Sequence, residues 1–297
     1  MGGFGFPNLN IQRIKREQIE PTVENMVNVL QFRGLTLDYC MSHLLGSVGR
    51  QESSGDIDIA LDRDLFYRQN LLEIRERIIA AYGSDHISHL ADHDDLMMSA
   101  FPIIGGESDA QVQIDFIFGK TDWLRFSHYS PGKDLSIYKG VVSQTVLMLA
   151  AKMNKEFVLE DEQGVYADVG LMIDIRRGMF RLWRLREIKN QLPGKVDADY
   201  WETNIKMPNG EEPPRFPRIG YVDEPAAAVR AILGDGVHPD DINTFEKLWA
   251  IVVKGSEEGR LPPADEIKAR AIDSLMKLAP FRDENTREEV ETWEVWK

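Results

Sequence analysis

The sequence predicts an α/β (α+β) fold in which a mixed β-sheet with flanking helices is followed by a mainly helical C-terminal region. Three strand-like segments carry this prediction, at residues 56–61, 96–104 and 110–118. Apolar residues at helical spacing precede and separate them, at residues 11–33 and 64–82. Strands that alternate with helices in this way place helices against the faces of one sheet.

The first third of the chain predicts a helix and two strands. The helix lies within residues 11–33 and ends before Gly34, a usual helix stop. Residues 35–45 are largely apolar and are expected to form the first strand, and residues 56–61 form the second. The polar segment 49–54 between them is expected to form a short helix.

The next elements complete the sheet. Residues 64–82 have a helical pattern that Gly83 closes. Residues 96–104 and 110–118 then form a pair of strands around a Gly-rich turn, which is typical of a β-hairpin. Pro102 favours an edge or the end of its strand.

A chain of 297 residues suggests one large or two modest domains. We expect a core domain at residues 1–135 and a mainly helical region at 136–297. That region contains a buried helix at 137–153 and an irregular Pro-rich stretch at 191–225. Three further helices are expected towards the C-terminus, at residues 226–233, 239–254 and 263–278.

Composition restricts the classes of function. The net charge of −14 argues against broad electrostatic capture of nucleic acid, which needs a basic surface. The single cysteine, Cys40, excludes an internal disulfide, and we expect it to be buried and inert. The chain has no apolar run of membrane-spanning length and no signal-peptide pattern, so we expect a cytoplasmic protein without a membrane partner.

One stretch, Leu45 to Leu61, carries most of the chemistry. Asp56 and Asp58 are two residues apart, so in a strand both carboxylates lie on one face. Two oxygen ligands side by side suit a hard divalent cation such as Mg²⁺. Upstream, Gly46 permits close approach of a ligand to the backbone, and Ser47 offers a hydroxyl and an N–H. The stretch therefore predicts a metal site beside a phosphate site.

These residues resemble a known family. The Gly46-Ser47 pair followed by Asp56-Ile57-Asp58 is similar to the signature of the nucleotidyltransferase superfamily that includes DNA polymerase beta. The family needs a third acid on a neighbouring strand, and the alternating segment 111–118 supplies Asp115 at its centre. The resemblance covers roughly residues 20–120. It implies a nucleotidyltransferase-type mixed sheet and a catalytic core within residues 1–135.

The resemblance also implies a reaction. The protein would transfer a nucleoside monophosphate from a nucleoside triphosphate such as ATP to an acceptor hydroxyl and release pyrophosphate. Two Mg²⁺ ions, with Mn²⁺ as a substitute, would be held by Asp56, Asp58 and Asp115, and Asp115 would also act as the base. Gly46, Ser47 and Arg50 would bind the leaving phosphates. The acceptor would be a short RNA end, a small molecule or a protein hydroxyl.

Other interpretations remain open from the sequence. The chain could be a non-catalytic binding or structural subunit that keeps the fold. It could be a metal-dependent phosphohydrolase that uses the His- and Asp-rich segment 86–95. Arg50 could pair with Glu52 instead of a phosphate. The basic segment 175–189 is expected to be a helix, with Arg177, Arg181 and Arg184 on one face, and it could bind an anion or pair with the protein's own acids.

Overall fold

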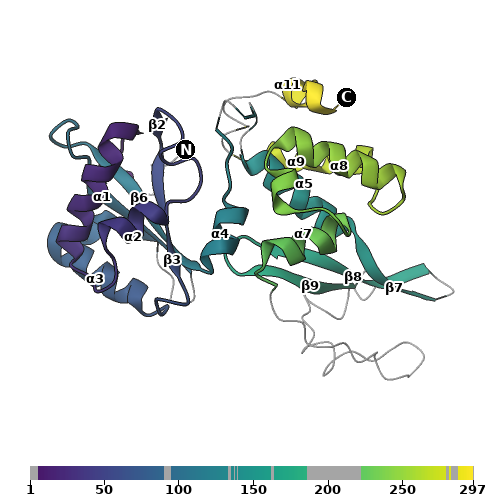
Figure 1. Ribbon diagram of the computed structural model, residues 1–297, viewed down its shortest axis with the longest axis horizontal. Coiled ribbons are helices and arrows are strands. Elements are labelled where there is room, and N and C mark those ends of the chain that lie inside the picture. Colours follow the sequence, from purple (N-terminus) through teal and green to yellow (C-terminus); the bar gives the residue numbers. More distant parts are fainter. Residues whose placement is uncertain are drawn as a thin grey trace. The chain divides into compact units, whose positions relative to one another are not determined.

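The protein forms two compact units (Figure 1). Unit 1 comprises residues 1–141 and the short turn 175–177, and unit 2 comprises residues 142–174 and 178–297. The computed structural model describes residues 6–89, 95–132, 135–136, 138, 140–161, 164–185, 222–278, 281 and 287–296.

Unit 1 is built on a mixed sheet of four strands in the order β3-β6-β5-β4. Their bounds are Asp56–Asp62 for β3, Ile87–His89 for β4, Leu96–Pro102 for β5 and Gln111–Gly119 for β6. β3 runs parallel to β6, whereas β5 is antiparallel to both β6 and β4. The predicted fold class, a mixed sheet with flanking helices, is confirmed, and so is the β5–β6 hairpin.

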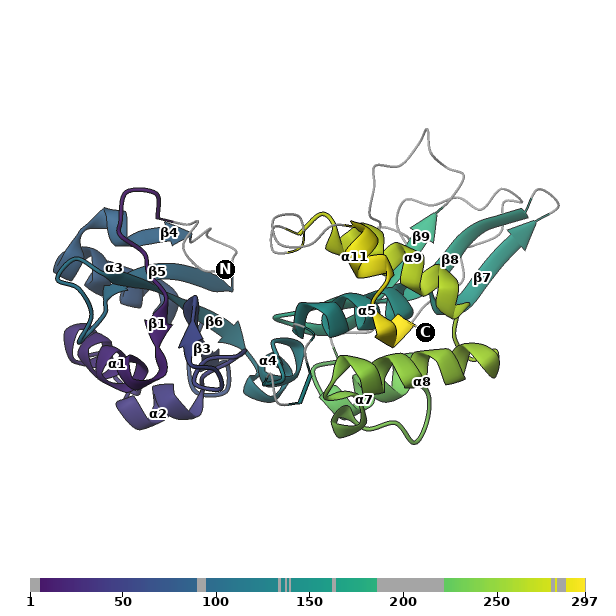
Figure 2. The ribbon, with the colours of Figure 1, turned by 90° about the horizontal axis from the view of Figure 1, so that it is seen from above.

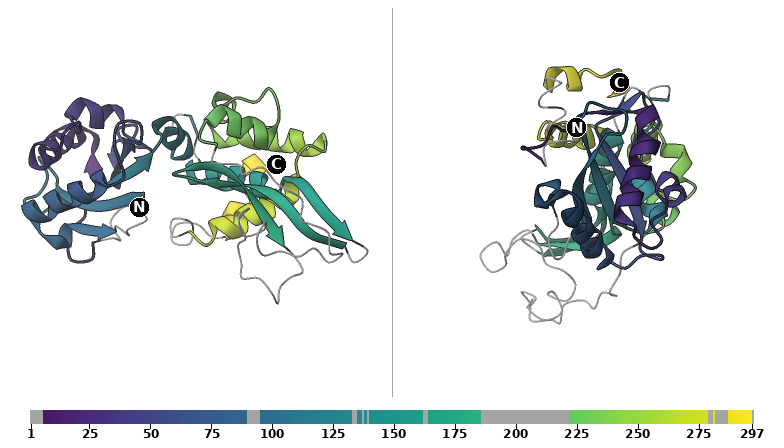
Figure 3. Two further views of the ribbon diagram at one scale, coloured as in Figure 1. Left: turned by 90° about the horizontal axis from the view of Figure 1, so that it is seen from below. Right: turned by 90° about the vertical axis from the view of Figure 1, so that its left-hand side faces the viewer.

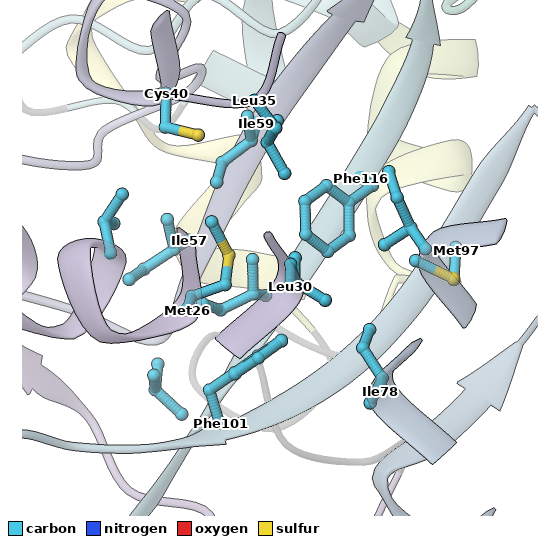
Figure 4. Close-up of a cluster of buried hydrophobic side chains, with 14 of the residues drawn as sticks. Met26, Leu30, Leu35, Cys40, Ile57, Ile59, Ile78, Met97, Phe101 and Phe116 are labelled. Carbon is cyan, nitrogen blue, oxygen red and sulfur yellow. The ribbon is translucent and has the colours of Figure 1, made fainter. Parts of the chain in front are cut away.

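Three helices cover one face of this sheet. They are α1 (Arg16–Leu30), α2 (Leu37–Ser42) and α3 (Asn70–Tyr82). Figure 4 shows their side chains meeting the sheet, where Met26 and Leu30 of α1 lie near Ile57 of β3. These residues belong to one buried apolar cluster, which also contains Cys40 and residues of β5 and β6. The core therefore takes every second residue of β3, and the residues between them lie on the opposite face.

The opposite face is apolar at one end and acidic at the other. Helix α4 (Thr121–Ser127) follows β6 and lies beside the ends of β3 and β6 in Figure 2. Its residue Leu124 packs with Ala60 of β3 and Ile117 of β6. Asp58 lies two residues before Ala60 on the same face and is only half-buried.

The prediction of a strand at residues 35–45 is wrong, because most of this segment is helix α2. Thr36 caps the helix, since its side chain accepts a hydrogen bond from the Tyr39 N–H at 3.1 Å. The apolar run is too short for periodicity to separate a strand from a helix. Only Leu44 pairs with the sheet, through an isolated antiparallel bridge to Ile59.

The prediction of a short helix at residues 49–54 is also wrong. Gly49 has a positive φ of 73°, which turns the chain, and residues 53–54 form β2 (Ser53–Ser54). β2 pairs antiparallel with β1 (Ile14–Lys15). This small sheet connects the chain before α1 to the start of β3. No local sequence pattern predicts this pairing.

Unit 2 combines a sheet with helices. Its antiparallel sheet has the order β7-β8-β9, with bounds Lys155–Asp161, Gly164–Asp174 and Gly178–Leu185 (Figure 3). Its helices include α7 (Pro225–Leu233), α8 (Phe245–Glu257), α9 (Ala264–Leu275) and α11 (Arg287–Glu291). Helix α5 (Gly140–Met153) begins at the end of unit 1 and continues into unit 2. It corresponds to the helix predicted at residues 137–153. Short 3₁₀ helices lie at Ser84–His86, Pro239–Ile242 and Glu294–Trp296.

The prediction of a basic helix at residues 175–189 is wrong, because residues 178–185 form strand β9. The helical spacing that would have gathered Arg177, Arg181 and Arg184 on one face therefore does not apply. Residues 186–221, with most of the Pro-rich stretch expected at 191–225, lie outside the described residues. No helix in the described part of the chain is both long and apolar enough to cross a membrane.

Candidate active site

The predicted acids Asp56, Asp58 and Asp115 lie on one face of the unit 1 sheet. β3 and β6 pair in register, so that Asp58 lies directly opposite Asp115 and Asp56 lies opposite Gln113. Neighbouring strands are about 4.8 Å apart, and residues paired on parallel strands have their side chains on the same face. All three aspartates are half-buried, on the face that the core does not use.

The surroundings of Asp58 disfavour its ionisation. Burial raises the pKa of Asp58 well above its usual range, and the carboxylates of Asp56 and Asp115 raise it further. Burial also raises the pKa of Asp56, and the positive charge of Arg13 partly offsets that effect. Like charges gathered on a half-buried face favour the binding of a cation between them.

Gln113 holds the third acid and was not predicted from the sequence. Its Nε2 donates to both carboxylate oxygens of Asp115, at 3.0 and 3.1 Å. Gln113 is only 4% exposed, so the amide is fixed by its surroundings. The alternation of residues 111, 113 and 115 placed Gln113 on the face of Asp115, and this was the signal that could have identified it.

The predicted phosphate loop, residues 46–50, begins beside Asp58. The Leu45 N–H donates to the Asp58 carbonyl at 2.9 Å, and the Ala60 N–H donates to the His43 carbonyl at 3.0 Å. These bonds hold the chain leading to Gly46 alongside β3. Gly46 has a φ of 63°, and a Cβ on it would lie 3.3 Å from Oδ2 of Asp58. The structure thus brings the backbone of Gly46 next to the carboxylate.

Ser47 and Arg50 form the turn that follows. The Arg50 N–H donates to the Ser47 carbonyl at 3.0 Å. The Arg50 guanidinium donates from Nη1 to the Ser130 carbonyl at 3.1 Å and lies over the Tyr129 ring, 5.1 Å from its centroid. No ion pair joins Arg50 to Glu52 among the described residues, so the alternative role considered for Arg50 has no support.

Two further polar groups near Asp56 escaped sequence analysis. Arg13 donates to Ser53, from Nε to the hydroxyl at 3.1 Å and from Nη2 to the carbonyl at 2.8 Å. The hydroxyl of Ser54 is buried and has no hydrogen-bond partner in the part of the chain that the structure describes. Both groups reach the start of β3 through the β1–β2 pairing, which joins segments 40 residues apart. A single sequence gives no signal for such a pairing.

The donor set suits a hard cation, although the side chains are not gathered around one point. Among the described residues, no group of three or more His, Cys, Asp or Glu side chains is arranged to hold a metal ion. Carboxylate oxygens are nevertheless the donors that Mg²⁺ prefers. In the His-rich segment, Nδ1 of His86 is 2.8 Å from the Ala100 carbonyl, and residues 90–94 lie outside the described part.

Comparison with known proteins gives a distant likeness. The sequence matches no family model and no curated protein. Among solved structures, the chain is similar to the crystal structure of Leishmania infantum polymerase beta in a ternary P/T complex. The TM-score is 0.37 and the identity is 12%, over 80% of this chain and 78% of that chain. The site described above therefore stands on its own contacts.

Proposed function

We propose that this protein transfers a nucleoside monophosphate from a nucleoside triphosphate to an acceptor hydroxyl. The observation that carries the proposal is the parallel register of β3 and β6, which sets Asp58 opposite Asp115 with Asp56 two residues away. Carboxylates on a shared, half-buried face provide the ligands for divalent cations in this type of reaction.

The three aspartates have distinct roles in the proposed reaction. Asp56, Asp58 and Asp115 would hold two Mg²⁺ ions, or Mn²⁺ in their place, which would neutralise the triphosphate and lower the pKa of the acceptor hydroxyl. The hydroxyl oxygen forms a bond to the α-phosphorus, the bond from that phosphorus to the bridging oxygen breaks, and pyrophosphate leaves. Asp115 accepts the hydroxyl proton.

The phosphate groups would be bound by the loop and its neighbours. The backbone at Gly46 lies beside Asp58, and the Ser47 hydroxyl and the Arg50 guanidinium would supply further donors from the same loop. Arg13 and the unpartnered hydroxyl of Ser54 offer further donors on the side of Asp56. Charge-assisted hydrogen bonds from arginine are well suited to phosphate oxygens.

The test supplies each labelled triphosphate with Mg²⁺ and three acceptor fractions: short RNAs, small-molecule extract and the protein itself. Wild-type protein is expected to transfer label to one fraction, and Asp58→Asn is expected to lower the rate on the order of 100-fold or more. Asp64→Asn is the matched control, because Asp64 is exposed and lies outside the acidic face. Transfer by Asp58→Asn at the wild-type rate would rule out the proposed chemistry.

A second candidate is a nucleotide-binding or structural subunit without catalysis. The observation in its favour is that Gln113 already binds both oxygens of Asp115. If this contact persists with nucleotide present, it occupies one acceptor site on each oxygen and makes Asp115 a weaker metal ligand and a weaker base. Calorimetry separates the candidates in part: an inert scaffold should bind neither Mg²⁺ nor triphosphate. A binding subunit should bind both, yet transfer no label.

A further inference from the structure

Tyr129 and Ser130 form a seat for the Arg50 guanidinium. The Tyr129 ring lies under the guanidinium carbon at 5.1 Å, and the Ser130 carbonyl accepts from Nη1 at 3.1 Å. Both residues follow α4, and Ser130 lies 80 residues after Arg50 in the sequence. The contact therefore fixes a long side chain from the phosphate loop at two points on another segment.

Gly140 packs closely against the backbone of this seat. A Cβ on Gly140, the first residue of α5, would overlap the Tyr129 carbonyl and would lie 2.9 Å from the Cα of Ser130. Any residue larger than glycine at this position must displace the backbone of the seat. The close packing indicates that the position of residues 129–130 is tightly constrained.

The seat leaves most of the guanidinium available. Arginine has five N–H donors, and the seat uses one of them. Arg50 is an exposed residue, whereas Tyr129 and Ser130 are half-buried. An aromatic face restricts the guanidinium to one plane without neutralising its charge. Such an arrangement reduces the entropy lost when the side chain binds an anion.

We infer that Tyr129 is a positioning residue, which holds the Arg50 guanidinium ready for the triphosphate chain of the nucleotide. The inference rests on the proposed function, and it adds a residue that the motif does not contain. Tyr129 acts through Arg50, so replacing both residues should cost no more than replacing Arg50 alone.

The experiment is a double-mutant cycle with Mg²⁺ and inorganic tripolyphosphate, a probe that needs neither the base nor the acceptor. Calorimetry compares wild type, Arg50→Ala, Tyr129→Leu and the double variant. Tyr129→Leu should weaken binding about 2- to 5-fold, the worth of an exposed cation–π contact. The double variant should bind as Arg50→Ala does, and Tyr129→Phe should restore wild-type binding because it keeps the ring.

A matched control is Tyr67→Leu, since Tyr67 is 71% exposed and no described cation lies over its ring. It should leave the affinity unchanged. An NMR measurement on the wild type does not depend on any variant folding: the Arg50 Nε–H resonance should show a ring-current shift relative to an arginine with no ring beside it. Absence of that shift overturns the inference.

The two possible failures are distinguishable. Additive effects of Arg50→Ala and Tyr129→Leu, with wild-type protein binding normally, would overturn the role of Tyr129 and leave the proposed function intact. Failure of wild-type protein to bind tripolyphosphate would overturn the triphosphate as the ligand of Arg50, and with it the proposed function.

Discussion

Ionisation of Asp58 is disfavoured on the acidic face, and this predicts how the stability of the protein depends on pH. Its pKa is raised by burial and by Asp56 and Asp115. A carboxyl whose pKa is higher in the folded protein stabilises that state below its unfolded value, about 3.9, and this contribution is lost as the pH rises through the folded value. Without metal, the wild type should therefore lose stability over this range, and Asp58→Asn should lose less.

Thermal unfolding in the presence of a chelator checks this expectation. At neutral pH, Asp58→Asn should unfold about 2–4 °C higher than the wild type, the shift that roughly 1 kcal/mol produces in a domain of this size. Added Mg²⁺ should raise the midpoint of the wild type and have less effect on the variant. A metal-free variant less stable than the wild type at neutral pH would contradict the electrostatic account.

Gly46 makes a prediction that separates backbone strain from crowding. Gly46→Ala must adopt a positive φ, which costs about 1–2 kcal/mol, and its Cβ would lie 3.3 Å from Oδ2 of Asp58. Gly105→Ala is the matched control, since Gly105 has a φ of 80° and nothing within 4 Å of a Cβ. Urea unfolding should show a similar loss for both variants, whereas only Gly46→Ala should weaken binding of Mg²⁺ and triphosphate. Equal binding by the two variants would show that Gly46 does not shape the site.

Individual residues also show how far a sequence defines a site. The spacing of Asp56 and Asp58 sufficed to place them on one face, because strand geometry repeats every two residues. Asp115 needed the family resemblance to be singled out, and its register with Asp58 came only from the structure. Arg13 contacts Ser53 and Tyr129 contacts Arg50, each across a long stretch of sequence, so no local pattern identified them. The catalytic roles themselves stay a prediction.

At the scale of elements, helix α2 is hydrogen-bonded to strand β3. The hydroxyl of Tyr39 donates to the Ala60 carbonyl at 3.0 Å and accepts from the Asp62 N–H at 2.9 Å. The helix is thereby bonded to β3 just beyond Asp58. A strand at this position would have paired along β3, whereas the helix packs on the sheet through apolar side chains such as Cys40, and only Leu44, beyond its end, forms a bridge to β3.

Tyr39→Phe tests this connection. Removal of the hydroxyl takes a hydrogen-bond partner from both the Ala60 carbonyl and the Asp62 N–H. It should destabilise the protein by about 1–3 kcal/mol. Burial raises the pKa of Tyr39 to about 12. The stabilisation is therefore complete below pH 10, near the unfolded value, and falls as the pH approaches 12. Urea unfolding between pH 7 and 11 should show the difference between wild type and variant shrinking at the alkaline end, and a constant difference would contradict this view.

Elements were predictable where the pattern was long or strictly alternating. β3, β6 and α1 have such patterns and form as expected. β9 was mistaken for a helix because Arg177, Arg181 and Arg184 are four and three residues apart, which is the spacing of one helix face. Its pairing with β8, which decides between the two, is a contact between segments and is invisible to local spacing.

At the scale of the whole molecule, the net charge of −14 argues against a long nucleic acid as the acceptor in the proposed reaction. Capture of long nucleic acid depends on many contacts between cations and phosphates, and its affinity falls steeply with salt. Of the cations that the structure describes, Arg13 is close enough to Asp56 to act on its pKa, and Arg13 and Arg50 would both be occupied by the proposed triphosphate. We therefore expect a small acceptor or a short end to be preferred over a long duplex.

Gel shift and labelled transfer together check this expectation. At about 150 mM salt, binding to a duplex of random sequence should be no tighter than roughly 100 μM, the weak end of non-specific binding. The same protein should transfer label to a small-molecule or short-RNA fraction. Because few phosphates are neutralised, the affinity for a short RNA should change little with salt. A steep salt dependence with sub-micromolar affinity for duplex DNA would mean that local basic surface outweighs the net charge, and that the acceptor is a long nucleic acid after all.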